Sequence, residues 1–203
     1  MSHYESNRQR ISTMTTDDAR SALRDILLKK SVMRGDFTLA SGAKSDLYVD
    51  CRLTTLDAAG ATHLGQVMLP LLRQAEAALG VKISGIGGLT MGADPVALAI
   101  AMASHQADPA SAVNAFSVRK EAKGHGRKKL VEGNFKAGDV VCAVDDVITT
   151  GGSTLQAIEK IEAEGGKVAC VLVLLDREEG GKANIEAKGY KVFSAFTRSS
   201  LLK

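Results

Sequence analysis

Residues 140–154 of this 203-residue chain have the sequence Val140-Val141-Cys142-Ala143-Val144-Asp145-Asp146-Val147-Ile148-Thr149-Thr150-Gly151-Gly152-Ser153-Thr154. An apolar, β-branched run ends in two adjacent carboxylates, and a polar turn and a helical segment follow. This order predicts a buried parallel strand, a loop at its carboxyl end, and a helix whose N-terminus faces the loop. The N–H groups and positive dipole end of such a helix favour a phosphate. Small residues let a ligand approach the backbone, and the carboxylates can hold sugar hydroxyls or a hydrated metal ion.

Residues 140–154 could also have one of two roles that involve no sugar phosphate. The strand could supply the metal-binding Asp of a nucleotide hydrolase, or the carboxylates could only cap the following helix. A nucleotide hydrolase of that kind needs the string G-x-x-x-x-G-K-[ST], which this sequence lacks. A helix cap needs one Asp or Ser and gives no reason for paired carboxylates before Thr-Thr-Gly-Gly-Ser. A binding loop for a sugar phosphate is therefore the favoured interpretation.

Length and composition are those of a globular α/β protein. With 203 residues, 45% of them hydrophobic, the chain is predicted to form one domain over 17–203, preceded by a polar, mobile tail at 1–16. The net charge of +3 is too small to predict nucleic-acid binding, and no apolar run is long enough for a membrane span. The three cysteines form no C-x-x-C pair, and the tail lacks a secretory apolar core. A reducing, cytoplasmic location is expected.

Strand-like and helix-like segments alternate along the chain. This alternation predicts an α/β fold with a mostly parallel sheet covered on both faces by helices. Ligands of such sheets bind at the carboxyl ends of the strands, where every candidate loop is expected to fall. The expected helices cover about 16–33, 56–79 (with a kink or break at Pro70), 93–104, 155–164 and 181–188. The expected strands cover two stretches of 37–52, then 81–86, 112–118, 140–145, 168–175 and 192–196, with loops at 87–92 and 119–133.

Residues 119–129 form a basic segment, Arg119-Lys120-Glu121-Ala122-Lys123-Gly124-His125-Gly126-Arg127-Lys128-Lys129. It could be a solvated basic loop or a nucleic-acid patch. The glycines on either side of the histidine allow the segment to bend and close. Several cations on such a loop suit a polyanionic leaving group such as pyrophosphate, most of all once closure excludes water.

The segment 85–95, Gly85-Ile86-Gly87-Gly88-Leu89-Thr90-Met91-Gly92-Ala93-Asp94-Pro95, comes close to the dinucleotide fingerprint G-x-G-x-x-G. Thr90 stands where the last glycine should be, so a dinucleotide site is disfavoured. The small residues nevertheless allow backbone amides to meet phosphate oxygens. A diphosphate-binding loop fits this spacing.

Arg177 follows a strand-like run in Leu174-Leu175-Asp176-Arg177-Glu178-Glu179-Gly180-Gly181. Its side chain could simply form an ion pair with the acidic neighbours. A guanidinium can also bind a ligand carboxylate bidentately, so Arg177 is a candidate for that role. Both roles remain open from the residues alone.

Four ordered motifs resemble one enzyme family. Residues 140–154 resemble the phosphoribosyl-diphosphate signature of the type I phosphoribosyltransferases, and R-K-E-A-K-x-H-G at 119–126 resembles the catalytic loop of the orotate phosphoribosyltransferases. The string F-T-L-x-S-G-x-x-S-x-x-Y at 37–48 is similar to the substrate-covering hood of that family, and L-D-R-x-E at 175–179 to its pyrimidine-holding motif. The type I phosphoribosyltransferase fold, with a small N-terminal hood mainly over 17–55 and a long catalytic loop at 119–133, is therefore expected.

The resemblance implies a reaction of orotate with phosphoribosyl diphosphate that gives orotidine 5′-phosphate and pyrophosphate, with Mg²⁺ as cofactor. Lys123 would be the main catalytic cation, and Arg119, Lys120 and His125 would grip the diphosphate. Asp145 and Asp146 would hold the ribose hydroxyls directly or through the metal, for which no direct ligand is assigned. The 5′-phosphate loop would comprise Thr149, Thr150, Gly151, Gly152, Ser153 and Thr154, and the diphosphate loop would include Thr90 and Met91. Orotate would contact Arg177, Thr149, Tyr48 and Ser41.

Two departures and two alternatives qualify this resemblance. Many family members have lysine where this chain has Ala40 and Met91, although a G-G-L-T-x-G-A-D-P subgroup exists. A type I enzyme for uracil or a purine would leave the loop at 119–126 and the hood unexplained. A non-catalytic sensor of phosphoribosyl diphosphate would not need the intact basic loop, and no DNA-recognition helix pattern is present. The resemblance implies a homodimer whose loop 119–129 reaches the partner's site, with no nucleic-acid or membrane partner.

Overall fold

The computed structural model describes residues 15–38, 44–121 and 129–203. In these ranges a six-stranded sheet has the order β5-β4-β3-β6-β7-β8. All neighbouring strands are parallel except β5, which runs antiparallel to β4. The strands are β3 (Gly85–Leu89), β4 (Asn114–Val118), β5 (Val131–Gly133), β6 (Val140–Ile148), β7 (Lys167–Asp176) and β8 (Val192–Thr197). The predicted α/β fold with a mostly parallel central sheet is confirmed.

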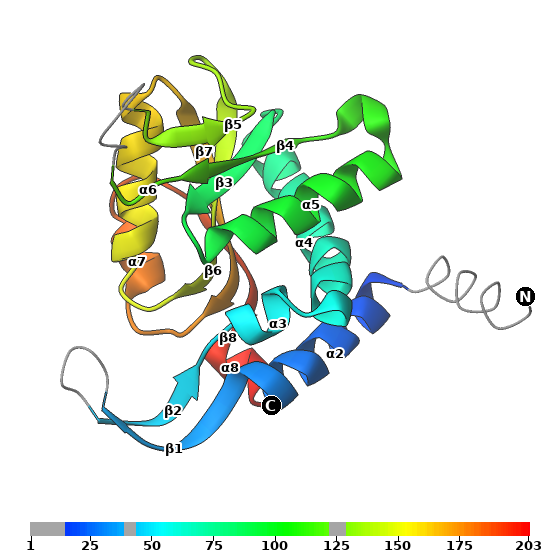
Figure 1. Ribbon diagram of the computed structural model, residues 1–203, viewed down its shortest axis with the longest axis vertical. Helices are drawn as coiled ribbons and strands as arrows, with labels where there is room; N and C mark the ends of the chain where they lie inside the picture. The colour runs from blue at the N-terminus through cyan, green and yellow to red at the C-terminus, as the bar shows by residue number, and fades with distance from the viewer. Residues whose placement is uncertain (1–14, 39–43, 122–128) are drawn as a thin grey trace, which may run out of the picture.

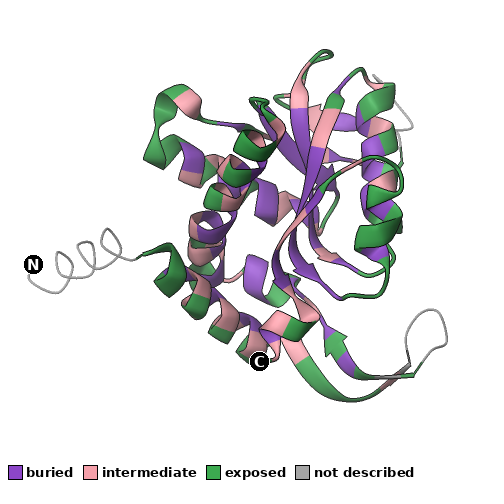
Figure 2. Cartoon of the chain, turned by 180° about the vertical axis from the view of Figure 1, so that it is seen from behind, coloured by how far each residue is buried: buried purple, intermediate pink, exposed green. Residues whose placement is uncertain are grey.

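Helices cover both faces of the sheet (Figure 1). One face carries α4 (Ala58–Leu79) and α5 (Ala93–Ala107), with α2 (Thr16–Ile26) packed on α4, and the other carries α6 (Gly152–Ala163) and α7 (Gly181–Glu186). Side chains 170–174 of β7 alternate between the two hydrophobic cores: Leu172 belongs to the core that includes α4 and α5 residues, and Val173 belongs to the core that includes α6 residues. Figure 2 shows the resulting concentration of buried residues along the central strands. Burial on both faces explains the continuous apolar runs in the sequence.

The N-terminal part of the chain adds a two-stranded antiparallel hairpin that projects from the carboxyl-end side of the sheet (Figure 1). A π-helical turn connects α2 to this hairpin, and a short helix leads on to α4. The elements are η1 (Leu27–Ser31), β1 (Val32–Thr38), β2 (Lys44–Val49) and α3 (Arg52–Thr55). The remaining short elements are η2 (Pro109–Ser111) and α8 (Arg198–Leu201).

Several predicted boundaries are wrong. The first helix ends at Ile26, since π-helical and strand conformations follow it before residue 33. The predicted loop at 119–133 ends before β5, because residues 131–133 pair with β4. Strand β6 extends past the two carboxylates, because its pairing with β7 continues to Ile148. The predicted break at Pro70 does not occur, since α4 runs through it.

The glycines at 87 and 88 were predicted in a loop but lie inside β3. A Cβ at Gly87 would lie 2.2 Å from the carbonyl oxygen of Phe116, and one at Gly88 would lie 2.0 Å from that of Val144. Glycine is therefore needed here for close packing of the strand against its surroundings and not for a turn. The loop proper is reduced to residues 90–92.

All three cysteines are free and buried, as expected for structural thiols. Within the described ranges, no helix combines the length and apolarity needed to cross a membrane.

Candidate active site

The chain order of the strands places the site. From β3 the chain moves outward to β4, whereas from β6 it moves the opposite way to β7 and β8. The two loops at the carboxyl ends of β3 and β6 therefore diverge and leave a crevice between them, which is where parallel sheets bind ligands. Residues 90–92 follow β3 and residues 149–151 follow β6. The basic segment and Arg177 follow the carboxyl ends of β4 and β7, so all four candidate loops lie at such ends.

Asp145 and Asp146 lie on β6 beside this crevice, and each is only 7% exposed. Asp145 Oδ2 accepts a hydrogen bond of 2.9 Å from Thr154 Oγ1, and Asp146 Oδ1 accepts one of 3.0 Å from the Val147 amide. Burial, and secondly the charge of Asp146, raises the pKa of Asp145 to about 7. Burial also raises the pKa of Asp146. Neither carboxylate forms an ion pair with a described side chain, so the pair suits hydroxyl donors or a hydrated cation.

The loop after β6 forms the N-terminus of α6. Gly151 has a φ of 82° and precedes the helix, and a Cβ there would lie 3.0 Å from the carbonyl oxygen of Gly181. A hollow of about 50 Å³ is lined by Asp145, Val147, Ile148, Thr149, Thr150, Gly151, Gly152, Ser153 and Thr154. The first amides of α6 have no partner within the helix, so the hollow has the properties of a phosphate site.

The loop after β3 approaches Asp146 closely. A Cβ at Gly92 would lie 2.5 Å from Asp146 Oδ1, so any other residue there would displace this carboxylate. The Thr90 hydroxyl donates to Asp94 Oδ2 at 3.1 Å, and the Ser117 hydroxyl donates to Asp94 Oδ1 at 2.6 Å. The Thr90–Met91 peptide bond is cis. Met91 is 58% exposed and contributes no charge at this position.

A cavity of about 350 Å³ joins these loops to the hairpin. Its lining comes from the end of β2 and start of α3, the loop after β3, the end of β6 with its loop, and the start of the basic segment. The lining residues are Tyr48, Val49, Asp50, Cys51, Arg52, Leu89, Thr90, Met91, Gly92, Lys120, Asp145, Asp146, Val147, Thr149 and Ser153. The structure thus brings together predicted residues for sugar, phosphate and base from four separate segments.

Several of the predicted site residues lie outside this cavity. Arg119 does not line it, and its Nη1 lies 3.9 Å from Glu132 Oε1. Arg177 does not line the cavity and is 6% exposed, with its Nη2 2.8 Å from Glu179 Oε1 and 3.5 Å from the carbonyl oxygen of Leu47. The ion pair with an acidic neighbour is therefore present, although the Arg177 Nε is buried without a partner. Lys123, His125, Ser41 and Ala40 lie outside the described residues.

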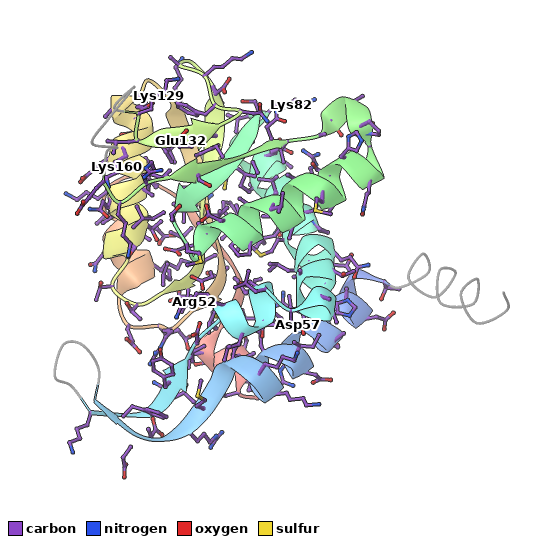
Figure 3. The ribbon with its side chains drawn as sticks, in the orientation of Figure 1. Arg52, Asp57, Lys82, Lys129, Glu132 and Lys160 are labelled. Atoms are coloured by element: carbon purple, nitrogen blue, oxygen red, sulfur yellow. The ribbon has the colours of Figure 1, made fainter. Side chains whose placement is uncertain are left out.

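Sequence reasoning missed two groups of residues around the site. Arg52, with Asp50 and Cys51, lines the cavity at the end of the hairpin motif, where an Asp-x-Arg sequence was the available signal. Lys160 of α6 donates to the carbonyl oxygens of Arg119 (3.0 Å) and Lys120 (2.6 Å). Figure 3 labels Lys160 on α6. The hydrogen bond between Lys160 and Lys120 joins residues 40 positions apart, so no local sequence pattern indicates it.

Known proteins resemble this chain over most of its length. No family model matches the chain. An orotate phosphoribosyltransferase of Aquifex aeolicus is 39% identical over 186 residues, covering 90% of this chain and 97% of the relative. One from Streptomyces avermitilis is 43% identical over 171 residues, covering 84% and 90%. The crystal structure of the Mycobacterium tuberculosis orotate phosphoribosyltransferase in complex with phosphoribosyl diphosphate has a TM-score of 0.72 and 34% identity, covering 91% of this chain and 99% of that one.

The sheet order, the switch point between β3 and β6, and these neighbours define the class as the type I phosphoribosyltransferases. The chain belongs to the orotate phosphoribosyltransferase family. It is an enzyme of the glycosyltransferase class whose reaction joins orotate to phosphoribosyl diphosphate, giving orotidine 5′-phosphate and pyrophosphate in pyrimidine biosynthesis.

Proposed function

We propose that the 350 Å³ cavity is the place where this transfer occurs and that the residues around it divide the substrates between them. The observation that carries the proposal is the buried Asp145–Asp146 pair, which lacks a described ion-pair partner and lies between the N-terminus of α6 and the diphosphate loop. In phosphoribosyl diphosphate the ribose hydroxyls lie between two anionic groups, the 5′-phosphate and the diphosphate. This order matches that of the α6 N-terminus, the carboxylate pair and the diphosphate loop.

The ribose 5-phosphate half of the substrate would lie over β6 and α6. Thr149 to Thr154 would donate backbone amides and hydroxyls to the 5′-phosphate. Asp145 and Asp146 would accept hydrogen bonds from the ribose hydroxyls, and Thr154 fixes the orientation of the Asp145 carboxylate. This half of the site is positioned before the substrate arrives, which lowers the entropy lost in reaching the reactive geometry.

Mg²⁺ fits this donor set as a companion of the substrate. The buried carboxylates offer oxygen ligands without an ion pair to a described side chain, yet the described residues form no cluster of three side chains that could hold a metal alone. Asp145 and Asp146 would therefore hold the ion together with oxygens of the diphosphate and water. When bound, it would neutralise charge that develops on the departing pyrophosphate.

Displacement at the anomeric carbon is proposed to pass through an oxocarbenium-like state, so positioning and charge compensation suffice without a protein nucleophile. Lys120 lines the cavity and would bind the departing diphosphate. Lys123, with His125 and Arg119, would complete this compensation through the basic segment. The role of Lys123 is assigned from its motif, since it lies outside the described residues.

Orotate would bind between the hairpin and the ribose. Tyr48 lines the cavity and is 38% exposed, and its aromatic ring suits stacking on the pyrimidine. The buried, unpartnered Nε of Arg177 supports its proposed role toward an orotate oxygen, together with Thr149 and Ser41. Because Arg177 does not line the cavity and contacts the Leu47 carbonyl oxygen, its approach to orotate would involve β2 as well.

A homodimer is proposed with the groove between α4 and α5 as its interface. The groove measures about 680 Å³, and Asp94 is the one charged residue among those that line it. Leu98 and Met102 are 55% and 56% exposed there. Met91 lines both the groove and the cavity, so a second copy seated on the groove would lie beside the site, as a loop shared between subunits requires. Leu98→Asp should shift the chain to a monomer in sedimentation, and an unchanged mass would reject this interface.

The three free, buried cysteines suit a proposed cytoplasmic location, where thiols stay reduced.

One steady-state assay tests the whole assignment. Turnover with Mg²⁺ and phosphoribosyl diphosphate is compared for orotate, uracil and hypoxanthine, with orotidine 5′-phosphate as the measured product in the first case. Turnover with orotate alone is expected. Preference for another base would support the alternative type I enzyme, and binding of phosphoribosyl diphosphate without any turnover would support a sensor.

A further inference from the structure

Arg52 is a cation at the cavity to which the motifs assign no role. It begins α3, directly after the hairpin, and its side chain is 49% exposed. Figure 3 shows it where the hairpin and α3 meet the carboxyl-end side of the sheet. Among the described residues that line the cavity, Arg52 and Lys120 are the two cations.

The pairing of Arg52 with Asp50 fixes the direction of the guanidinium. Nε donates to Asp50 Oδ1 and Nη2 donates to Oδ2, both at 2.9 Å. These hydrogen bonds raise the pKa of Arg52 further, so the group stays charged. This side-on arrangement uses Nε–H and one Nη2–H, and it leaves two hydrogens on Nη1 and one on Nη2. The free edge is the one with which arginine grips two oxygens of a phosphate.

The cavity that Arg52 lines also contains the residues proposed to bind the diphosphate. Arg52 shares the cavity with Thr90, Met91 and Gly92 of the loop after β3 and with Lys120 of the basic segment. The positive charge of Arg52 also acts on Asp146, where it opposes the larger effect of burial on the pKa. An anion bound between Arg52 and Lys120 would therefore lie over the loop where this chain has the uncharged Met91.

We propose that Arg52 binds the diphosphate of phosphoribosyl diphosphate and supplies the positive charge that Met91 does not. The proposal rests on the cavity being the transfer site. Asp50 is a positioning residue in this arrangement, because it holds the guanidinium side-on and presents the free edge to the ligand. Lysine at position 52 would retain the charge but lose both the fork and its fixed orientation.

The experiment compares Arg52→Ala and Arg52→Lys with the unsubstituted enzyme. Calorimetric titration with pyrophosphate and Mg²⁺ measures the proposed contact without any turnover. Steady-state kinetics then give separate KM values for phosphoribosyl diphosphate and orotate. Arg52→Ala should raise the pyrophosphate Kd and the phosphoribosyl-diphosphate KM about 10- to 100-fold, the scale for a charge-assisted hydrogen-bonded contact, with the orotate KM changed less than about threefold. Arg52→Lys should give a pyrophosphate Kd and a phosphoribosyl-diphosphate KM between those of the unsubstituted enzyme and those of Arg52→Ala.

Arg198→Ala is the matched control. Arg198 is also a half-exposed arginine paired with an aspartate, 3.5 Å from Asp46, but it does not line the cavity. Its substitution should leave the pyrophosphate Kd unchanged. Thermal unfolding checks that the Arg52 variants remain folded, and an unfolded Arg52→Ala leaves Arg52→Lys and Arg52→Gln to carry the comparison.

Two results would overturn the proposal. One is an unchanged pyrophosphate Kd in folded Arg52 variants. The other is a rise confined to the orotate KM, which would place Arg52 at the pyrimidine carboxylate. Failure of the broader assignment is distinct, because the unsubstituted enzyme would then bind pyrophosphate without converting orotate.

Discussion

The β6–α6 segment and the β1–β2 hairpin form opposite walls of one cavity, yet they are held in different ways. Strand β6 is paired on both sides by parallel strands, and its carboxylates are fixed by buried hydrogen bonds. The hairpin strands pair only with each other within the described ranges, with an irregularity between Arg34 and Phe37. An isolated two-stranded hairpin is marginal in water, so its position depends on anchors at its base.

Those anchors combine the buried β2 side chains of Leu47 and Val49 with specific polar contacts. The Ser31 and Thr54 hydroxyls lie 2.7 Å apart with both residues buried, and the Asp50 amide donates to the Ser31 carbonyl oxygen at 2.9 Å. Lys30 forms an ion pair with Asp57 at the start of α4. The difference between the walls indicates that the proposed ribose-phosphate side is rigid and that the proposed base side is adjustable. Changes to the first should affect catalysis, and changes to the second should affect orotate binding.

Asp146→Asn would break the rigid wall and should have the largest effect. The amide keeps the size of the side chain but removes the charge that faces the cavity, so kcat/KM should fall at least ~100-fold, as for loss of one transition-state contact. Steady-state kinetics measure the loss, with the exposed Asp25→Asn as control. The folded state should not be weakened, since a buried charge is removed. A fall below about threefold would remove Asp146 from the mechanism.

Asp145→Asn tests whether the raised pKa of Asp145 makes the stability of the protein depend on pH. The pKa of Asp145 is raised to about 7 in the folded state, against about 3.9 unfolded, so the folded state binds the proton more tightly. The stabilisation of the folded state by this proton is present at low pH and is lost as pH rises through about 7. Urea unfolding from about pH 5 to about pH 8 should show this decline in the unsubstituted protein and less of it in Asp145→Asn, a difference on the order of 2 kcal/mol. Parallel curves for the two proteins would contradict it.

Lys160→Met asks whether the rigid wall also controls the basic segment. Lys160 donates to the carbonyl oxygens of Arg119 and Lys120 at the start of the segment. Glu164, directly after α6, accepts from the Leu130 and Val131 amides that follow the segment. Loss of the Lys160 bonds should lower kcat about tenfold with little change in the orotate Kd. Lys167→Met, an exposed change on β7, is the control. Equal effects of the two substitutions would reject the role.

Thr54→Val is the mildest test and acts on the hairpin wall. It removes the partner of the buried Ser31 hydroxyl and should cost about 1–2 kcal/mol of unfolding free energy. The orotate KM should rise a few-fold while the phosphoribosyl-diphosphate KM changes less. Thr62→Val, which removes an exposed hydroxyl bonded within α4, serves as control. Equal rises in both KM values would mean that the two walls are not independent.

The β6–α6 wall could be predicted from sequence because its information is local. A β-branched run, two carboxylates and a Thr/Gly turn occur in consecutive residues. Because the carboxyl ends of parallel strands lie at the same edge of a sheet, the location of this loop follows from the strand assignment alone. The extension of β6 to Ile148 could not be predicted, because pairing with β7 overrides the polarity of Asp145 and Asp146. Gly87 and Gly88 likewise favoured a loop in the sequence, whereas glycine is needed at these positions for close packing in the sheet.

The remaining site depends on contacts between distant segments. Lys120 lines the cavity and Arg119 does not, although both belong to one basic motif. Arg52 reaches the cavity only because the hairpin folds over the end of β6, and the pairing of Lys160 with residues 119 and 120 requires the whole sheet. Such long-range placement leaves no periodicity or spacing in the sequence.

The close approach of Gly92 to Asp146 has a consequence for redesign. Any side chain at position 92 would displace the Asp146 carboxylate, so a change in the loop after β3 would disturb the side proposed for the sugar. At the β2 end of the hairpin, Tyr48 is exposed and lines the same cavity. An engineer who wishes this scaffold to accept a different nucleobase should therefore vary the hairpin and leave the sheet loops untouched.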